Sequence, residues 1–204
     1  MRRFIEGYKL FRKKYVLGEQ AVMNELSKKG QQPEVMVVAC CDSRVDPAVI
    51  LQCDPGDLFV VRNVANIIPS FTDDDSHHGT CAALEFAITV LKVKHLVIMG
   101  HSQCGGVQAL LSKALTSTHH FINNWVKTID DPELAHIHDP DLYAQNALGI
   151  SHKNALSFPW IKERLSNNSL QIHEWFFDIG EGKLLIRDRL KNEFVELTAT
   201  ADAM

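Results

Sequence analysis

The stretch that decides the fold class is an apolar run that ends in a polar turn, Val35-Met36-Val37-Val38-Ala39-Cys40-Cys41-Asp42-Ser43-Arg44. Its first five residues are continuously apolar and rich in β-branched side chains. A strand with one solvated face alternates apolar and polar residues, whereas a strand covered on both faces is apolar throughout. The run therefore predicts a buried strand of a parallel sheet over residues 35–39.

Two further runs of the same kind follow, at residues 58–61 and 96–99. Between them, residues 79–93 carry apolar side chains at helical spacing: Ala83, Phe86, Ala87, Val90 and Leu91. A strand, a helix and a strand in this order favour a right-handed crossover between parallel strands. We therefore expect an α/β fold with a central, mostly parallel β-sheet flanked by helices.

The two ends of the chain carry different patterns. Residues 2–29 place apolar side chains among charges at helical spacing, which predicts an N-terminal helical arm over residues 1–29. Near the other end, a late edge strand or hairpin is predicted by Trp175-Phe176-Phe177-Asp178, a turn at Glu181-Gly182, and Leu184-Leu185-Ile186. No linker or repeat interrupts the chain, so we expect a single domain over residues 1–204.

Composition excludes several classes of protein. The chain has 204 residues, a hydrophobic fraction of 46% and a formal net charge of -4. Nucleic-acid binding is favoured by a basic surface, and 21 basic against 25 acidic residues argue against it. No apolar run reaches the ~18 residues of a membrane-spanning helix, and charges interrupt the segment behind Met1, so we expect neither membrane helix nor signal peptide. The run Asp73-Asp74-Asp75 with His77-His78 is interpreted as a solvated loop.

The cysteines indicate a compartment. There are five of them, and an odd number without a signal peptide fits a reducing environment better than a disulfide framework. We therefore expect a cytoplasmic protein.

Two groups of polar residues follow predicted strands. Cys40-Cys41-Asp42-Ser43-Arg44 follows the first strand, and His101-Ser102-Gln103-Cys104-Gly105-Gly106 follows the third. Carboxyl ends of neighbouring parallel strands meet at one edge of a sheet, where ligands bind in open α/β folds. Zinc prefers thiolate and imidazole ligands, and three of them leave a fourth position for water, as in catalytic sites. The sequence therefore predicts a zinc site in which bound water becomes hydroxide near neutral pH.

Spacing alone leaves open whether Cys40 or Cys41 is the third ligand beside His101 and Cys104. A hydrogen-bonded loop histidine is the alternative for His101. A non-catalytic zinc-binding or redox-sensing protein is the alternative for the whole site, with Cys41 or Asp42 as a fourth ligand. The other two cysteines are interpreted as small core residues: Cys53 and Cys81.

Charged and small residues beside the ligands have roles of their own. Asp42 next to Arg44 is expected to stay ionised, because the opposite charge favours the carboxylate. It could then accept a hydrogen bond from the zinc-bound hydroxide, although a plain structural ion pair is the alternative. Gly105 and Gly106 let the backbone pass close to the metal and begin a helix, whose N-terminus favours thiolate at Cys104.

Together these motifs resemble the signature of β-class carbonic anhydrases, Cys-x-Asp-Ser-Arg followed by His-x-x-Cys-Gly-Gly. Further segments are similar to that family: residues 55–66, Leu84-Glu85-Phe86-Ala87 and Trp175-Phe176-Phe177-Asp178-Ile179. The resemblance covers roughly residues 30–190. It implies a lyase that reversibly hydrates carbon dioxide to bicarbonate and a proton, with one Zn²⁺ per chain. It also implies that Cys40, His101 and Cys104 hold the zinc, and that Asp42 and Arg44 form the catalytic dyad.

The substrate pocket resembles that of the plant-like, non-allosteric subtype. Gln31 stands nine residues before Cys40, where this subtype has a substrate-binding glutamine. The tryptophan of the allosteric subtype has no counterpart, because Ala39 precedes the ligand. The resemblance implies a substrate site formed by Gln31, Phe59, Val64, Phe86, Gly105 and Gly106. Phe86 stands where a tyrosine is common and Glu174 where a glycine is common; the sequence suggests no role for Glu174.

Family members form dimers that assemble into tetramers or octamers, with the active site at the dimer interface. The resemblance therefore implies a homodimer here, assembling to a tetramer or higher, in which Gln31 and Phe59 reach the partner's zinc. The N-terminal arm would pack on a neighbour. The closest alternative is an enzyme of the same fold that hydrolyses a related heterocumulene, carbonyl sulfide or carbon disulfide.

Overall fold

The computed structural model describes residues 1–204 except 20, 75–77, 114, 116–117 and 198–204. A six-stranded sheet runs through it in the order β2-β1-β3-β4-β5-β6. The strands are β1 (Val35–Cys40), β2 (Leu58–Asn63), β3 (His95–His101), β4 (Gln171–Asp178), β5 (Lys183–Asp188) and β6 (Glu193–Glu196). The pairs among β2, β1, β3 and β4 are parallel, and β5 and β6 add antiparallel strands. This confirms the predicted α/β class and the late hairpin.

The helices lie in the N-terminal arm and in the connections between the strands. In chain order they are α1 (Arg2–Arg12), η1 (Lys13–Leu17), α2 (Val22–Lys29), α3 (Pro47–Ile50), η2 (Val64–Asn66), α4 (Gly79–Glu85), η3 (Phe86–Leu91), α5 (Gly105–Leu111), α6 (His120–Val126), η4 (Lys127–Ile129), η5 (Pro132–Leu134), α7 (Pro140–Ala155) and α8 (Pro159–Ser166). The helix expected over residues 79–93 is α4 continued by the π-helical η3, and it ends at Lys92, whose φ of 57° is left-handed.

One strand was not predicted. β6 is four residues long, and only Phe194 and Val195 of them are apolar. Phe194 packs at 6.1 Å from the ring of Phe176 in β4, so tertiary contacts with β5 and β4 stabilise this strand. A local pattern this short carries too little signal to distinguish a strand from a turn.

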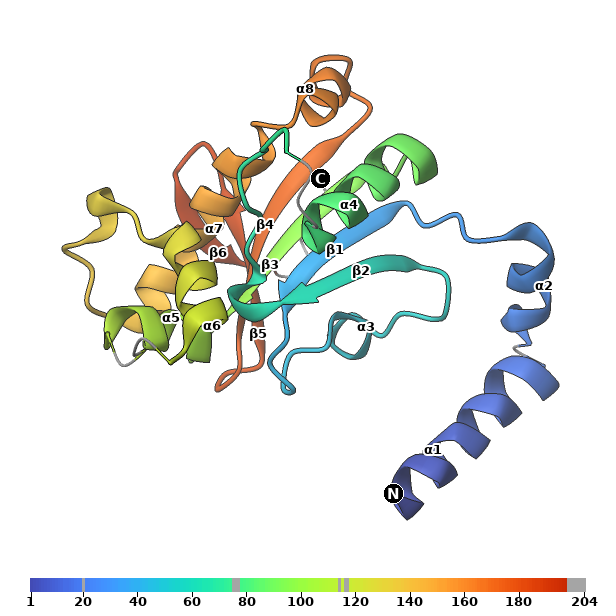
Figure 1. Cartoon of the computed structure of the whole chain (residues 1–204). Coiled ribbons are helices and arrows are strands. Elements are labelled where there is room, and N and C mark those ends of the chain that lie inside the picture. Colours follow the sequence, from blue (N-terminus) through green and yellow to red (C-terminus); the bar gives the residue numbers. More distant parts are fainter. Residues whose placement is uncertain (20, 75–77, 114, 116–117, 198–204) are drawn as a thin grey trace.

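Both faces of β1 and β3 are covered, as their continuous apolar runs predict, whereas the edge strand β2 is half-buried and its Val60 is exposed, which corrects the expectation for residues 58–61. Successive strand residues point to opposite faces. Met36 and Val38 belong to the larger core, which α4, α7 and α8 cover (Figure 1). Val37 and Ala39 belong to a second buried cluster on the other face, against which Ile50 of α3 packs. The carboxyl ends of β1 and β3 are thus fixed rigidly from both sides.

The N-terminal arm lies away from the sheet. Figure 1 shows α1 and α2 projecting from the body of the protein, and neither helix has a buried residue. Its apolar side chains are open to solvent in the single chain, with Phe4 71% and Tyr8 63% exposed. None of the helices in the described part of the chain combines the length and apolar character needed to cross a bilayer.

Candidate metal centre

Three metal-ligating side chains converge where β1 and β3 end. Cys40 is the last residue of β1, His101 the last of β3, and Cys104 immediately precedes α5. Their ligand atoms all lie within 4.8 Å of one another, and no other group of at least three such residues gathers in the described ranges. The three side chains are buried, at 5%, 0% and 1% exposure. Cys41 is exposed and outside the cluster.

The histidine presents a free nitrogen to this cluster. His101 Nδ1 lies 2.8 Å from the carbonyl oxygen of Ser102. Since a carbonyl can only accept, Nδ1 carries the proton and Nε2 keeps its lone pair. Nε2 is buried and has no hydrogen-bond partner in the described part of the chain. A buried, unpartnered acceptor is costly unless a ligand completes it, and the tautomer fixed by a backbone carbonyl is the one metal-binding histidines use.

The two thiols are electrostatically coupled. A hydrogen bond from the Cys104 thiol lowers the pKa of Cys40 to about 4 even though burial opposes ionisation. The resulting thiolate and burial raise the pKa of Cys104. The pair therefore holds one negative charge readily, and a bound cation would release the second proton.

An ionised carboxylate lies beside the cluster. Arg44 donates from Nε to Asp42 Oδ1 at 2.9 Å and from Nη2 to Asp42 Oδ2 at 2.7 Å, a bidentate pair. The Arg44 backbone N–H adds a third bond to Oδ1 at 3.0 Å. These bonds hold the pKa of the Asp42 carboxyl well below its usual range, with Arg44 the largest cause. Asp42 is therefore an acceptor over the whole neutral pH range.

A second arginine, which sequence reasoning missed, fixes the same loop. Arg62 of β2 donates to the carbonyls of Cys40 at 2.8 Å and Asp42 at 2.7 Å. It also forms a 2.7 Å ion pair with Asp46. Its guanidinium thus ties the loop after β1 to the neighbouring strand. Arg62 directly follows the strand predicted at residues 58–61. This position at the carboxyl end of a strand is the sequence feature that could have indicated a role at the site.

The two glycines after Cys104 differ. A Cβ on Gly106 would lie 2.7 Å from Val64 Cγ1 and 3.1 Å from Ala65 Cβ, so this position requires glycine. A Cβ on Gly105 would meet nothing within 4 Å, so close packing within this chain does not explain it. Val64 is itself held by Trp125, which donates from Nε1 to the Val64 carbonyl at 2.8 Å.

The expected pocket residues fall into separate groups in a single chain. Phe59 and Phe86 stack at 6.0 Å between ring centroids, and Phe86 is 42% exposed. Val64 lines an apolar hollow of about 550 Å³ with Cys41, Asn63, Phe121, Ile122 and Trp125. Gln31 lies exposed before β1, and the six residues of β1 span about 17 Å between it and Cys40. Gln31 therefore cannot reach the metal cluster of its own chain.

Other residues singled out in the sequence have structural positions. Cys53 and Cys81 are both half-buried. Cys81 packs against the larger core, in agreement with the expectation of a small core residue, whereas Cys53 belongs to neither described core cluster, which corrects the expectation for it. Asp73 and Asp74 are exposed, and His78 lies 2.9 Å from Asp74. Asp75 and His77 lie outside the described residues.

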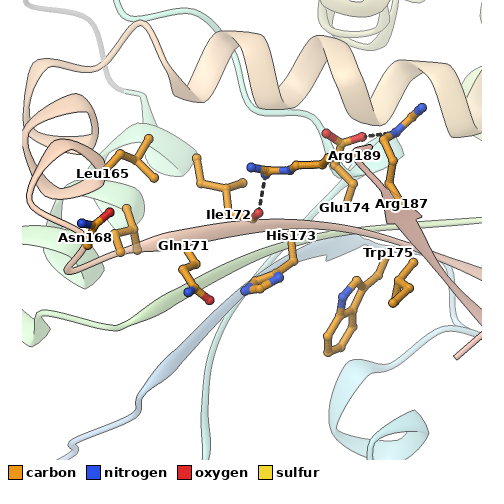
Figure 2. A pocket seen from close by; sticks show the side chains of 11 residues that line it. Leu165, Asn168, Gln171, Ile172, His173, Glu174, Trp175, Arg187 and Arg189 are labelled. Carbon is orange, nitrogen blue, oxygen red and sulfur yellow. Dashed lines mark hydrogen bonds and ion pairs between the residues drawn. The ribbon is translucent and has the colours of Figure 1, made fainter. Parts of the chain in front are cut away.

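A hollow of about 470 Å³ lies at the other end of the sheet, along β4 (Figure 2). Figure 2 shows Arg189 above the strand, donating to the Ile172 carbonyl, and Arg187 paired with Glu174. Gln171, which lines it, pairs with His95 at the start of β3, whereas the cluster of Cys40, His101 and Cys104 lies at the far end of that strand. This hollow is therefore separate from the metal cluster.

Comparisons with known proteins agree with this geometry. The carbonic anhydrase family model matches residues 35–184. A carbonic anhydrase of Synechocystis sp. is 34% identical over all of this chain and 77% of its own length. One from Synechococcus elongatus is 32% identical over 95% of this chain and 74% of its own length.

Solved structures give the same result. The β-carbonic anhydrase CcaA superposes with a TM-score of 0.86 at 33% identity, covering 98% of this chain and 93% of its own. A tetrameric β-carbonic anhydrase of Sordaria macrospora superposes with a TM-score of 0.78 at 30% identity, covering 91% and 95%. By sequence, fold and the convergence of its cysteine and histidine side chains, this chain belongs to the β-carbonic anhydrase family.

Proposed function

We propose that this protein catalyses the reversible hydration of carbon dioxide to bicarbonate and a proton. The observation that carries the proposal is the buried cluster of Cys40, His101 and Cys104, in which His101 Nε2 has no hydrogen-bond partner among the described residues. The loop that carries the ionised Asp42 lies beside this cluster. Membership of the β-carbonic anhydrase family gives the reaction class.

The donor set fits zinc. Two sulfurs and one imidazole nitrogen are ligands that zinc prefers, and three protein ligands are the number found at catalytic rather than structural sites. When bound, one Zn²⁺ per chain would supply Lewis acidity that makes water a nucleophile near neutral pH. Cys40, His101 and Cys104 would hold it.

Asp42 orients the nucleophile in this proposal. Because Arg44 keeps its carboxylate ionised and directed by two hydrogen bonds, Asp42 can only accept a hydrogen bond. Accepting from the attacking water or hydroxide turns that oxygen's lone pair toward carbon dioxide, a positioning effect. Arg44 is thus the residue that keeps Asp42 in its acceptor role.

Apolar side chains receive the substrate. Phe59, Phe86 and Val64 offer surfaces without hydrogen-bonding groups, which suit carbon dioxide better than water. The plant-like, non-allosteric subtype is part of the proposal because Ala39 precedes Cys40, where the allosteric subtype has its tryptophan.

The site is completed by a second copy of the chain. Gln31 lies at the opposite end of β1 from Cys40, so a Gln31 contact with substrate must come from a partner subunit. Exposed apolar side chains on the arm and around Phe86 supply surface for such a dimer: Phe4, Tyr8, Leu10, Val60, Phe86 and Val90. Assembly to a tetramer or higher follows the tetrameric relative of Sordaria macrospora. We place the protein in the cytoplasm because an odd number of cysteines, five, fits a reducing compartment better than a disulfide framework.

The alternatives predict different observations. A closed, non-catalytic zinc or redox site needs a fourth protein ligand, and Cys41 is exposed outside the cluster. Hydrolysis of carbonyl sulfide or carbon disulfide uses the same ligands, so relative turnover of these substrates separates it from carbon dioxide hydration.

The test is stopped-flow carbon dioxide hydration at mildly alkaline pH by the zinc-loaded protein, with metal-stripped protein as control. We expect fast, zinc-dependent hydration. Asp42→Asn should bind one zinc per chain but lose at least about 100-fold in turnover, the scale of a lost proton-directing group. Full turnover in Asp42→Asn would refute the role of Asp42; no turnover by the wild type would refute the function.

A further inference from the structure

Gln103 connects the metal-ligand turn to the Asp42–Arg44 pair. It lies between the proposed ligands His101 and Cys104. Its side-chain Oε1 accepts from Arg44 Nη1 at 3.2 Å, and its backbone carbonyl accepts from Arg44 Nη2 at 3.3 Å. Asp42 accepts from Nε and Nη2 of the guanidinium, and Gln103 accepts from Nη1 and Nη2.

The donors of Arg44 are almost all used. A guanidinium has five N–H groups, and four of them are directed at Asp42 and Gln103. If Gln103 Oε1 were absent, the Arg44 guanidinium could rotate away from Asp42 while breaking one hydrogen bond fewer. Gln103 therefore adds directly to the rigidity of the pair.

Gln103 itself is held in an unfavourable backbone conformation. Its φ is 57°, in the left-handed region that glycine adopts most easily. A non-glycine residue persists there only when its surroundings fix it, and such residues cluster at functional sites. A role for the side chain explains why this position is not glycine.

Asp141 fixes that conformation. Its Oδ1 accepts from the Gln103 backbone N–H at 2.5 Å. Asp141 lies in the first turn of α7, where the capping residue Asp139 accepts from the Asp141 N–H at 2.9 Å. The start of a 16-residue helix thus anchors the ligand turn.

We infer that Gln103, fixed by Asp141, is a positioning residue that keeps Arg44 on Asp42 and so keeps Asp42 from becoming a ligand of the metal. This rests on the proposed function. An Asp42 carboxylate released by Arg44 would be available as an oxygen ligand for a Zn²⁺ held by Cys40, His101 and Cys104, which three protein ligands would leave with an open position. Gln103 acts through Arg44 and does not touch the substrate.

The test compares four variants. Gln103→Leu removes the acceptor and keeps the side-chain size. Gln103→Glu keeps an oxygen acceptor. Gln103→Gly removes the side chain and places at the positive φ the residue that tolerates it best. If Gln103→Leu does not fold, Gln103→Gly takes its place in the test. Gln171→Leu, at the exposed start of β4, is the matched control.

Two readouts are measured. One is kcat for carbon dioxide hydration. The other is titration of the Co²⁺-substituted protein with azide, followed by visible absorption, because azide enters only an open coordination position. In Gln103→Leu and Gln103→Gly we expect kcat to fall about tenfold, the effect of one hydrogen bond to a charged group, and the apparent azide Kd to rise about tenfold. Gln103→Glu and Gln171→Leu should stay within about twofold of wild type.

The outcomes are distinct. Wild-type azide binding and turnover in Gln103→Leu or Gln103→Gly would overturn the inference. Equal losses in Gln103→Glu and Gln103→Leu would assign Gln103 a folding role and overturn it as well. An inactive wild type would refute the proposed function alone, because the azide titration does not need turnover.

Discussion

The most demanding test of the structure concerns Glu174, a residue to which the sequence assigned no role. Its carboxylate is 6% exposed and lies 2.6 Å from His152 Nδ1 of α7 and 2.6 Å from Arg187 Nε of β5. Burial alone would raise the pKa of Glu174, but His152 and Arg187 outweigh it and the net pKa is lowered. Glu174 therefore joins three elements through one buried charge.

Glu174→Gln keeps the shape and removes the charge. Arg187 is 13% exposed and would then be buried without an ionic partner. Breaking a buried pair from one side costs about 3–5 kcal/mol in the free energy of unfolding. For a chain of 204 residues, each kcal/mol lowers Tm by about 2–4 °C, so we expect a decrease of about 6–20 °C.

The assay is thermal unfolding of the zinc-loaded protein at pH 7, followed by circular dichroism. The control is Glu181→Gln, which breaks the exposed Lys183 pair and should change Tm little. The double variant Glu174→Gln/Arg187→Met should recover part of the loss, because no charge is left alone. A Tm decrease below about 2 °C in Glu174→Gln, or no recovery in the double variant, would refute the reasoning.

Four further predictions concern the pH dependence of the Glu174 contribution, the two glycines after Cys104, the metal and Cys41. The stability that Glu174 contributes is present above its unfolded pKa and is lost as pH falls through its lower folded pKa, so the Tm gap between wild type and Glu174→Gln should narrow below about pH 4. A gap that widens below about pH 4 would contradict this. Gly106→Ala should lower the free energy of unfolding by about 1–3 kcal/mol and lower turnover, because its Cβ displaces Val64, whereas Gly105→Ala should fold as well as wild type or better. Calorimetry and the hydration assay check both variants. Equal losses of stability in the two variants would contradict the packing around Gly106. Chelation of the metal should lower Tm, since the metal binds only the folded cluster. Metal analysis of Cys41→Ser should still find one zinc per chain, and loss of zinc in that variant would make Cys41 a ligand.

The sequence by itself determined the fold class and the chemical nature of the site. Continuous apolar runs at residues 35–39, 58–61 and 96–99 predicted strands covered on both faces. The structure confirms all three strands and confirms the two-sided burial of β1 and β3, but β2 is an edge strand whose Val60 is exposed in the single chain. Polar residues after such strands had to gather at one edge of the sheet, which brought Cys40 and His101 together. These features were predictable because strand periodicity and ligand preference are properties of short segments.

Only the tertiary structure decided the rest. Spacing left open whether Cys40 or Cys41 is the ligand, and the family resemblance implied Cys40. In the structure Cys40 is buried in the cluster and Cys41 is exposed, because one residue's shift along an extended chain reverses the direction of a side chain. The bonds of Arg44 to Gln103, 59 residues away, join two segments that no local pattern connects. Buried charges such as Glu174 acquire their partners from other elements, so their roles depend on how helices and strands pack rather than on the residues beside them in the chain.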